Sequence, residues 1–221
     1  MKALLFALLT AALFVFAGCD SRPEALQKES KPAAVAVALP PTGLPAEAEQ
    51  ALLARGQAIV KEAGALLSSN LLAAIQAKGL TNALAYCSVK ALPLAELVAA
   101  GNKVELRRVS HRARNPQGKA DAFESEVLRR FQSQLAPNQP PPALLTSNRA
   151  DTVTFFAPVV INNPLCLQCH GEPGKDIAPE NLTFIRGLYP QDAATGFKQG
   201  DLRGAWRVDF PRAALSGKWQ P

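Results

Sequence analysis

The feature that most constrains this chain is the segment Cys166-Leu167-Gln168-Cys169-His170. Two cysteines separated by two residues and followed at once by a histidine form the C-x-x-C-H pattern of covalent haem attachment. The two thiols add to the vinyl groups on one edge of the porphyrin, and the adjacent imidazole reaches the iron from one face. With only 4 cysteines and 2 histidines in 221 residues, the pattern rarely arises by chance.

Other uses of this cysteine pair fit the sequence less well. A thioredoxin-like redox pair does not require His170, and no βαβ pattern surrounds the motif. A structural zinc site needs four ligands, and the sequence contains no second C-x-x-C. A simple disulfide leaves the histidine unexplained. We therefore predict one covalent haem c, attached through Cys166 and Cys169, with His170 as the proximal iron ligand.

The sixth iron ligand is open at this stage. Met1 is the only methionine and lies in the predicted leader, which excludes a Met/His cytochrome. Cys87 sits in a predicted helix with apolar neighbours, so it is either a small core residue or a thiolate ligand. His111 lies in a polar segment and is either a solvated loop residue or the alternative distal ligand. An open site is the third possibility.

The N-terminus has the composition of a bacterial export signal. Lys2 precedes an apolar run that is too short to span a membrane, and Phe16-Ala17-Gly18-Cys19 resembles a lipobox. We predict a lipoprotein-type signal peptide over residues 1–18, lipidation at Cys19, a disordered Pro- and Ala-rich tether over 19–45, and a haem domain over 46–221. The protein would then be an exported lipoprotein anchored on the periplasmic side of a membrane.

The order of periodic segments predicts an α+β fold. Helices are expected first and strands mostly later, which favours an antiparallel sheet. Gly79 is expected to end the first helix, and Pro93 to kink or break the second near Leu92. The expected helices are 46–78, a segment from 81 onward, 121–135 and 179–186, and the expected strands are 104–109, 152–161 and 205–210.

The charge of the chain indicates a cofactor contact but no nucleic-acid surface. The formal net charge is +6, and no basic patch is interleaved with stacking aromatic residues. Basic residues do cluster from 107 to 114. Within that cluster, Arg108, Arg112 and Arg114 could pair with haem propionates, or they could simply form a solvated face.

Over about residues 50–211, the sequence resembles the exported c-type haem proteins with a PAS-like fold, a family long catalogued as a domain of unknown function. The matching pieces are Tyr86-Cys87, Arg107 through Pro116, Cys166 through Gly171, and Tyr189 through Ala205. The resemblance implies a PAS-like antiparallel sheet flanked by N-terminal helices. It also implies His/Cys axial ligation, with His170 proximal and Cys87 distal.

These observations together favour a membrane-tethered mono-haem protein with a low-potential redox or signal-sensing role, because an anionic thiolate stabilises ferric iron. The alternative is an electron-transfer cytochrome that serves a respiratory or photosynthetic complex. A redox or signalling partner protein is expected in either case. We predict no catalytic residues, since a peroxidase would need an open iron site, which a Cys87 ligand would block.

Overall fold

The computed structural model describes residues 38–137 and 139–215. It has helices α1 (Ala46–Asn102), α2 (Ala122–Gln134), α3 (Pro164–His170) and α4 (Pro179–Leu188). Its strands are β1 (Glu105–Val109), β2 (Leu144–Arg149), β3 (Thr152–Val160) and β4 (Leu202–Pro211), with short 3₁₀ turns at Pro116–Gly118 and Arg212–Ala214. The predicted signal peptide and Cys19 lie outside the described residues.

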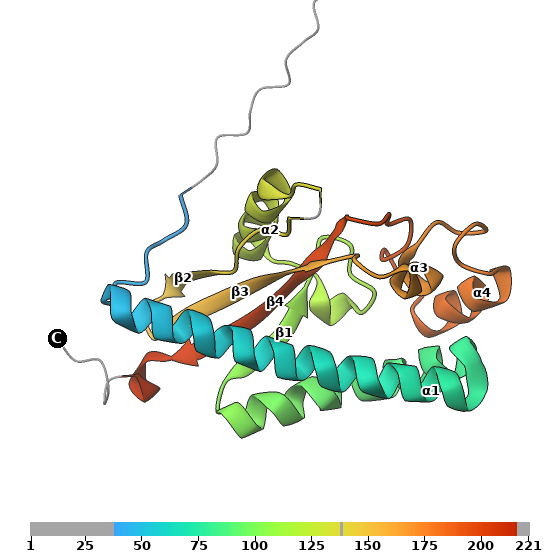
Figure 1. The fold of residues 1–221 in the computed structure, drawn as a ribbon, viewed down its shortest axis with the longest axis horizontal. Coiled ribbons are helices and arrows are strands. Elements are labelled where there is room, and N and C mark those ends of the chain that lie inside the picture. The colour runs from blue at the N-terminus through green and yellow to red at the C-terminus, as the bar shows by residue number, and fades with distance from the viewer. Residues whose placement is uncertain (1–37, 138, 216–221) are drawn as a thin grey trace, which may run out of the picture. The chain divides into compact units, whose positions relative to one another are not determined.

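Helix α1 is a pair of helical limbs joined by a sharp bend (Figure 1). The bend lies at Lys78 and Gly79, whose backbone angles are not helical. Gly79 has φ 77° and ψ −178°, a conformation open essentially only to glycine. The expected end of the first helix at Gly79 is thereby confirmed, and the second limb returns alongside the first.

The predicted break at Pro93 is wrong. The second limb of α1 keeps helical backbone angles through this residue. Both Pro93 and Val89, the residue four positions earlier, are exposed to solvent. The carbonyl that loses its partner at a proline can therefore be hydrated, and the clash with the ring can be relieved on the open side of the helix.

The four strands form one antiparallel sheet in the order β1-β4-β3-β2. Strand β4 lies at the centre and pairs Arg108 with Trp206 on one side and Ala157 with the same Trp206 on the other. The β3–β4 register shifts between Val159 and Val160, so the start of β4 is irregular. The helices and this sheet confirm the predicted α+β class.

The two faces of the sheet carry separate helices. Trp206, Val208 and Phe210 alternate along β4 and join one core cluster with Leu52 and Ile59 of α1. Ala205 of the same strand joins Phe156 and the α2 residues Val127, Leu128 and Phe131 in a second cluster. This two-residue alternation is what a strand covered on both faces requires.

Residues just before α1 also lie against the fold. The Thr146 hydroxyl donates to the carbonyl of Pro40 at 2.8 Å, and the Arg212 guanidinium donates to the carbonyl of Thr42. The last part of the predicted tether is thus in contact with β2 and with the 3₁₀ turn that follows β4.

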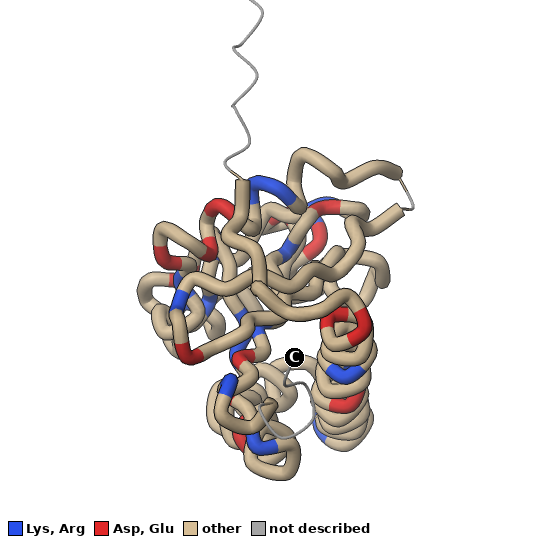
Figure 2. Tube along the Cα trace, turned by 90° about the vertical axis from the view of Figure 1, so that its left-hand side faces the viewer, with Lys and Arg blue, Asp and Glu red and all other residues tan. Residues whose placement is uncertain are grey.

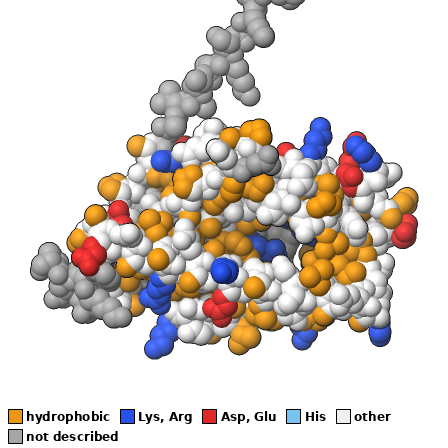
Figure 3. All heavy atoms as spheres, in the orientation of Figure 1, with side chains coloured by type: hydrophobic (Ala, Val, Ile, Leu, Met, Phe, Trp, Pro, Cys, Tyr) orange, Lys and Arg blue, Asp and Glu red, His pale blue; other side chains and the backbone are white. Residues whose placement is uncertain are grey.

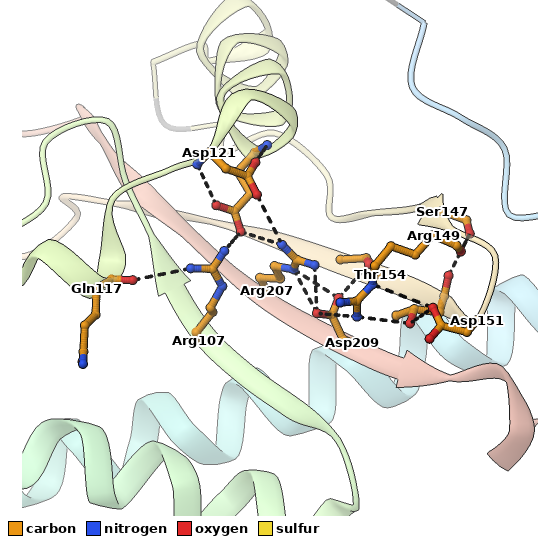
Figure 4. A network of polar contacts seen from close by, with 11 residues as sticks. Arg107, Gln117, Asp121, Ser147, Arg149, Asp151, Thr154, Arg207 and Asp209 are labelled. Atoms are coloured by element: carbon orange, nitrogen blue, oxygen red, sulfur yellow. Dashed lines mark hydrogen bonds and ion pairs between the residues drawn. The ribbon is translucent and has the colours of Figure 1, made fainter.

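A buried charge network fastens α2 to the sheet (Figure 4). Glu124 is fully buried and accepts from Arg107 and from Arg207, the latter at 2.7 Å. Arg207 also contacts Asp209 at 2.9 Å, and Thr154 donates to that carboxylate at 2.6 Å. Burial acts against the charge of Arg207, but the bonds to Asp209 and Glu124 outweigh it and raise its pKa. Because its buried charges are paired, we regard the network as structural.

Charged residues of both signs are spread over the domain (Figure 2). By length and composition alone, α1 could cross a membrane, since its most apolar stretch has a mean hydropathy of 1.4. Only 28% of that stretch is buried, although α1 also contributes Leu52, Ile59, Ala63 and Val98 to the core against the sheet.

Candidate functional site

The C-x-x-C-H residues form a short helix, α3, that lies beyond the end of the sheet (Figure 1). Asn163 caps it by accepting from the amide of Leu165 at 2.9 Å, and Pro164 occupies its first turn. In a helix, residues three and four positions apart share a face. Cys166 therefore lies on the same side as Cys169 and His170; all three side chains are partly buried, and both cysteines are free thiols.

The His170 ring is held in one tautomer. Its Nδ1 donates to the carbonyl oxygen of Ala194 at 2.8 Å, which leaves Nε2 with a free lone pair. Phe197 meets the ring edge-on, with 6.3 Å between centroids. Burial lowers the pKa of His170 well below its usual value, and the charges of Arg203 and Arg114 lower it further. The imidazole is thus neutral and oriented, as a metal ligand must be.

Backbone contacts join the motif to the segment before β4. The amide of Phe197 donates to the carbonyl of His170 at 2.9 Å, and that of Gly196 donates to Gly171 at 2.6 Å. Gly171 has no room for a side chain, because a Cβ there would come within 2.4 Å of the Asp176 Cβ and 2.6 Å of the Leu167 carbonyl. The end of α3 is therefore held rigidly.

Arg114 holds the same two segments through its side chain. Its guanidinium donates to the Cys169 carbonyl at 2.5 Å and to the Ala194 carbonyl at 3.3 Å. It also forms an ion pair with Asp192 at 3.2 Å, in which the two side chains are only 13% and 4% exposed. Asp192 in turn accepts from the Ala194 amide at 2.9 Å. Arg114 thus supports both the motif and the carbonyl that orients His170.

Cys87 reaches this region from the second limb of α1. Leu84, one turn earlier, packs with Ile177 and Ile185 beside Cys169. Burial raises the pKa of the Cys87 thiol, although Arg108 and Arg114 act to lower it. Burial likewise raises the pKa of Cys169 to about 11, and the nearby Cys87 and Cys166 add to this effect. The structure therefore brings Cys87 into electrostatic range of the motif, 79 residues or more away along the chain.

Of the two arginines whose charges lower the pKa of Cys87, Arg108 has the larger effect. Its guanidinium lies 5.4 Å from the centroid of the Trp206 ring on the α1 face of the sheet. The side chain is accessible to solvent, yet desolvation lowers its pKa, against the opposing effects of Cys87 and Tyr189. A side chain that water reaches but protein surrounds lies in a recess. Figure 3 shows such a hollow, with basic side chains at its depth and apolar side chains along one wall.

His111 and Arg112 lie elsewhere. Both are exposed and line a cleft that also includes Leu128 of α2. Arg112 stacks on Phe197 at 4.1 Å and donates to the Ala193 carbonyl at 3.2 Å. Neither Cys87 nor the C-x-x-C-H residues line this cleft. The roles predicted for His111 and Arg112 stay predictions.

The donor set suits a cofactor that brings in-plane ligands of its own. Within residues 38–137 and 139–215, no three His, Cys, Asp or Glu side chains are grouped so as to hold a bare metal ion. A free imidazole nitrogen, two thiols on one helical face and a third thiol nearby instead suit an iron porphyrin. Among the described residues, no carboxylate forms an ion pair with Arg108, so its guanidinium is suited to an anionic substituent.

Comparison with known proteins settles the family. The profile of the Tll0287-like family matches residues 27–211. The chain belongs to the Tll0287-like family. A solved structure described as the cyanobacterial heme-protein Tll0287 is 22% identical, covers 76% of this chain and 97% of its own, and has a TM-score of 0.55. At that identity the likeness establishes the fold. None of the curated proteins matches.

Sequence reasoning missed several residues that shape the site of this family member. Asp192, Ala194 and Phe197 orient His170 or its supports, and Arg203 adds charge beside it. All four lie in the segment Tyr189 through Ala205, which carried part of the family resemblance. Their roles depend on contacts with residues about 24 to 90 positions away, so spacing alone could not assign them.

Proposed function

We propose that this chain is a mono-haem c-type protein with a PAS-like fold. Cys166 and Cys169 would form the thioether bonds, His170 would bind the iron through Nε2, and Cys87 would be the distal ligand. The observation that carries the proposal is the oriented, neutral His170 of the C-x-x-C-H motif, together with a Cys87 thiol that lies within electrostatic range of Cys169 in the same motif. The structural similarity to Tll0287, a cyanobacterial heme-protein, supports it.

The chain's own residues have separable tasks in this proposal. The Ala194 carbonyl holds the proton on His170 Nδ1, and Arg114 positions that carbonyl. Arg108 would meet a propionate, whereas Arg112 lines a separate cleft and Arg114 is paired with Asp192, so neither has this role in the proposal. The bound haem supplies reversible one-electron chemistry and an iron that can take small ligands. When not coordinated, Cys87 is a neutral thiol at physiological pH, because burial raises its pKa.

The biological role that we propose is low-potential redox chemistry or signal sensing at a membrane surface. An anionic sulfur ligand favours ferric iron and hence a low potential. Lipidation at Cys19, behind a signal peptide over 1–18, would hold the domain on the periplasmic side. Electron transfer to a respiratory or photosynthetic complex is the alternative role. In both, the partner is a protein that is not yet identified.

Attachment is tested by mass spectrometry of the denatured protein after expression with a c-type maturation system. One haem should stay bound through denaturation, and Cys166→Ala together with Cys169→Ala should abolish this covalent retention. A chain that loses its haem on denaturation would disprove covalent attachment while leaving non-covalent binding possible.

Ligation is tested by electron paramagnetic resonance of the ferric protein beside Cys87→Ala and a control, His111→Ala. A low-spin signal with a narrow g-spread that is lost only in Cys87→Ala would identify the distal ligand. Loss in the His111 variant instead would transfer the role to His111. A high-spin signal in the unmodified protein would mean an open iron site. Retention of both ligands on reduction would favour the electron-transfer role over sensing.

A further inference from the structure

A second hollow lies on the other face of the sheet, beside α2. Its volume is about 240 Å³, which is enough for a small organic molecule but below the range typical of drug-sized ligands. Its walls come from the segment after β1, from α2 and from the start of β4. Its lining includes His111, Arg112, Leu128, Gln132, Phe197 and Arg203.

The floor of this cleft carries two cations on one aromatic ring. The guanidinium of Arg112 lies 4.1 Å from the Phe197 centroid, and that of Arg203 lies 5.3 Å from it. Neither forms an ion pair with a carboxylate in the described part of the chain. Asp201 also lines the cleft, but its Oδ2 accepts from the Lys198 amide at 2.7 Å. The cleft therefore has an excess of positive charge.

Arg203 is incompletely satisfied. Its Nη1 donates to the Ser110 hydroxyl and to the Arg112 carbonyl, both at 3.0 Å, but its buried Nε has no hydrogen-bond partner. An unpaired buried donor is costly, and more so when it is charged. Burial, with the charges of Arg108 and Arg114, lowers the pKa of Arg203 to about 9. A negative charge in the cleft would favour the charged form of this guanidinium.

We propose that this cleft is a binding site for a small carboxylate with a short apolar body. The carboxylate would lie between Arg112 and Arg203, because guanidinium groups match its planar geometry. The apolar body would contact Phe197 and Leu128, while Gln132 and His111 stand at the polar rim. Apolar walls favour such a molecule over inorganic phosphate, which would leave them exposed to water.

The cleft is connected directly to His170. Phe197 lines the floor of the cleft, and its ring meets the His170 ring edge-on, with 6.3 Å between the centroids. The backbone amide of Phe197 also donates to the His170 carbonyl. Arg203 exerts its charge on the same imidazole. A carboxylate in the cleft would offset that positive charge and stabilise the ferric state. This second step rests on the proposed haem function, whereas the binding step does not.

The test is calorimetric titration of the haem-loaded protein with butyrate, butyramide and inorganic phosphate. Butyramide keeps the shape but lacks the charge, and phosphate keeps the charge but lacks the apolar body. We expect saturable binding of butyrate, weaker binding of phosphate and none of butyramide. Arg112→Gln should weaken butyrate binding at least about tenfold, as expected for loss of a charged hydrogen-bond donor.

The matched control is Arg186→Gln, which removes the same charge from an exposed position on α4 outside the cleft. It should bind butyrate like the unmodified protein. The proposal would be overturned if butyrate and phosphate bound equally well, or if both variants weakened butyrate binding equally, because either result would indicate a general effect of charge. An absence of saturable butyrate binding would overturn it too. Haem content is measured on every sample, so that a failure of the haem proposal is seen separately.

Redox titration with and without saturating butyrate tests the connection to His170. The midpoint potential should move in the negative direction in the unmodified protein and in Arg186→Gln, and much less in Arg112→Gln. An unchanged potential despite saturable binding would refute the coupling and leave a binding site without influence on the iron.

Discussion

Arg114 offers the sharpest test of how the site is held together. It is the only side chain in the described structure that donates to both the motif carbonyl of Cys169 and the orienting carbonyl of Ala194. It also neutralises Asp192, which is 4% exposed. We expect Arg114→Gln to destabilise the folded protein and to loosen the orientation of His170.

The magnitude follows from burial. Removing one partner of a buried ion pair leaves the other charge uncompensated and typically costs about 3–5 kcal/mol. For a domain of this size, 1 kcal/mol corresponds to roughly 2–4 °C in Tm, so a fall of about 6–20 °C is expected. Thermal unfolding followed by circular dichroism on the haem-loaded protein measures it. The Soret band should broaden in parallel, because the carbonyl that orients His170 loses its support.

The double variant Arg114→Met with Asp192→Leu separates charge from packing. It removes both members of the pair, so no buried charge is left unpaired, and it should regain much of the lost stability. Two results would refute the view that the buried Asp192 charge depends on its pairing with Arg114. One is a fall in Tm of less than about 2 °C in Arg114→Gln, and the other is a double variant with a lower Tm than the single variant.

Three further predictions follow from local geometry. Gly56→Ala should lower the free energy of unfolding by about 1–3 kcal/mol, because a Cβ there would lie 2.5 Å from the Phe155 ring. Gly64→Ala, in the same helix but with free space around it, should raise the free energy of unfolding by about 0.4–1 kcal/mol. Urea unfolding of the two variants distinguishes these outcomes. Gly79→Ala meets no atom within 4 Å but forces an alanine to φ 77°, so its cost of about 1–3 kcal/mol is conformational, and an unchanged midpoint would contradict the bend geometry. In haem-free protein, the raised pKa of Cys87 keeps the thiol protonated through neutral pH, so alkylation should be slower than in the unfolded chain and should accelerate only at higher pH; equal rates would show that the thiol is not desolvated.

Local signals were sufficient for most elements of the fold. The expected start at Asp121 is confirmed, because its carboxylate accepts from the Glu124 amide in a capping box. Strand β3 matches the β-branched run that begins at Thr152. The last strand begins earlier than expected, at Leu202, because the register shift beside Val159 extends its pairing. In these cases the residues that determine the element lie within it.

Two elements escaped prediction because their neighbours determine them. Strand β2 has only three ladder partners before its register shifts, and its sequence follows a proline-rich run that predicted irregular structure. Helix α3 has seven residues, too few for a helical period to be read, and it is held by its Asn163 cap and by contacts to the segment before β4. Such pairing and docking energies come from distant residues.

The site likewise has one part that local sequence identifies and another that depends on distant residues. The motif residues are adjacent in sequence, so a short pattern can identify them as candidates for the attachment of one cofactor. The residues around them come from a helix limb that returns at Gly79, from the segment after β1 and from the segment before β4. These residues come together because of the bend in α1 and the register of the sheet. The pattern can therefore predict a haem-attachment site, whereas the charges around that site and the second axial ligand that we propose depend on tertiary structure.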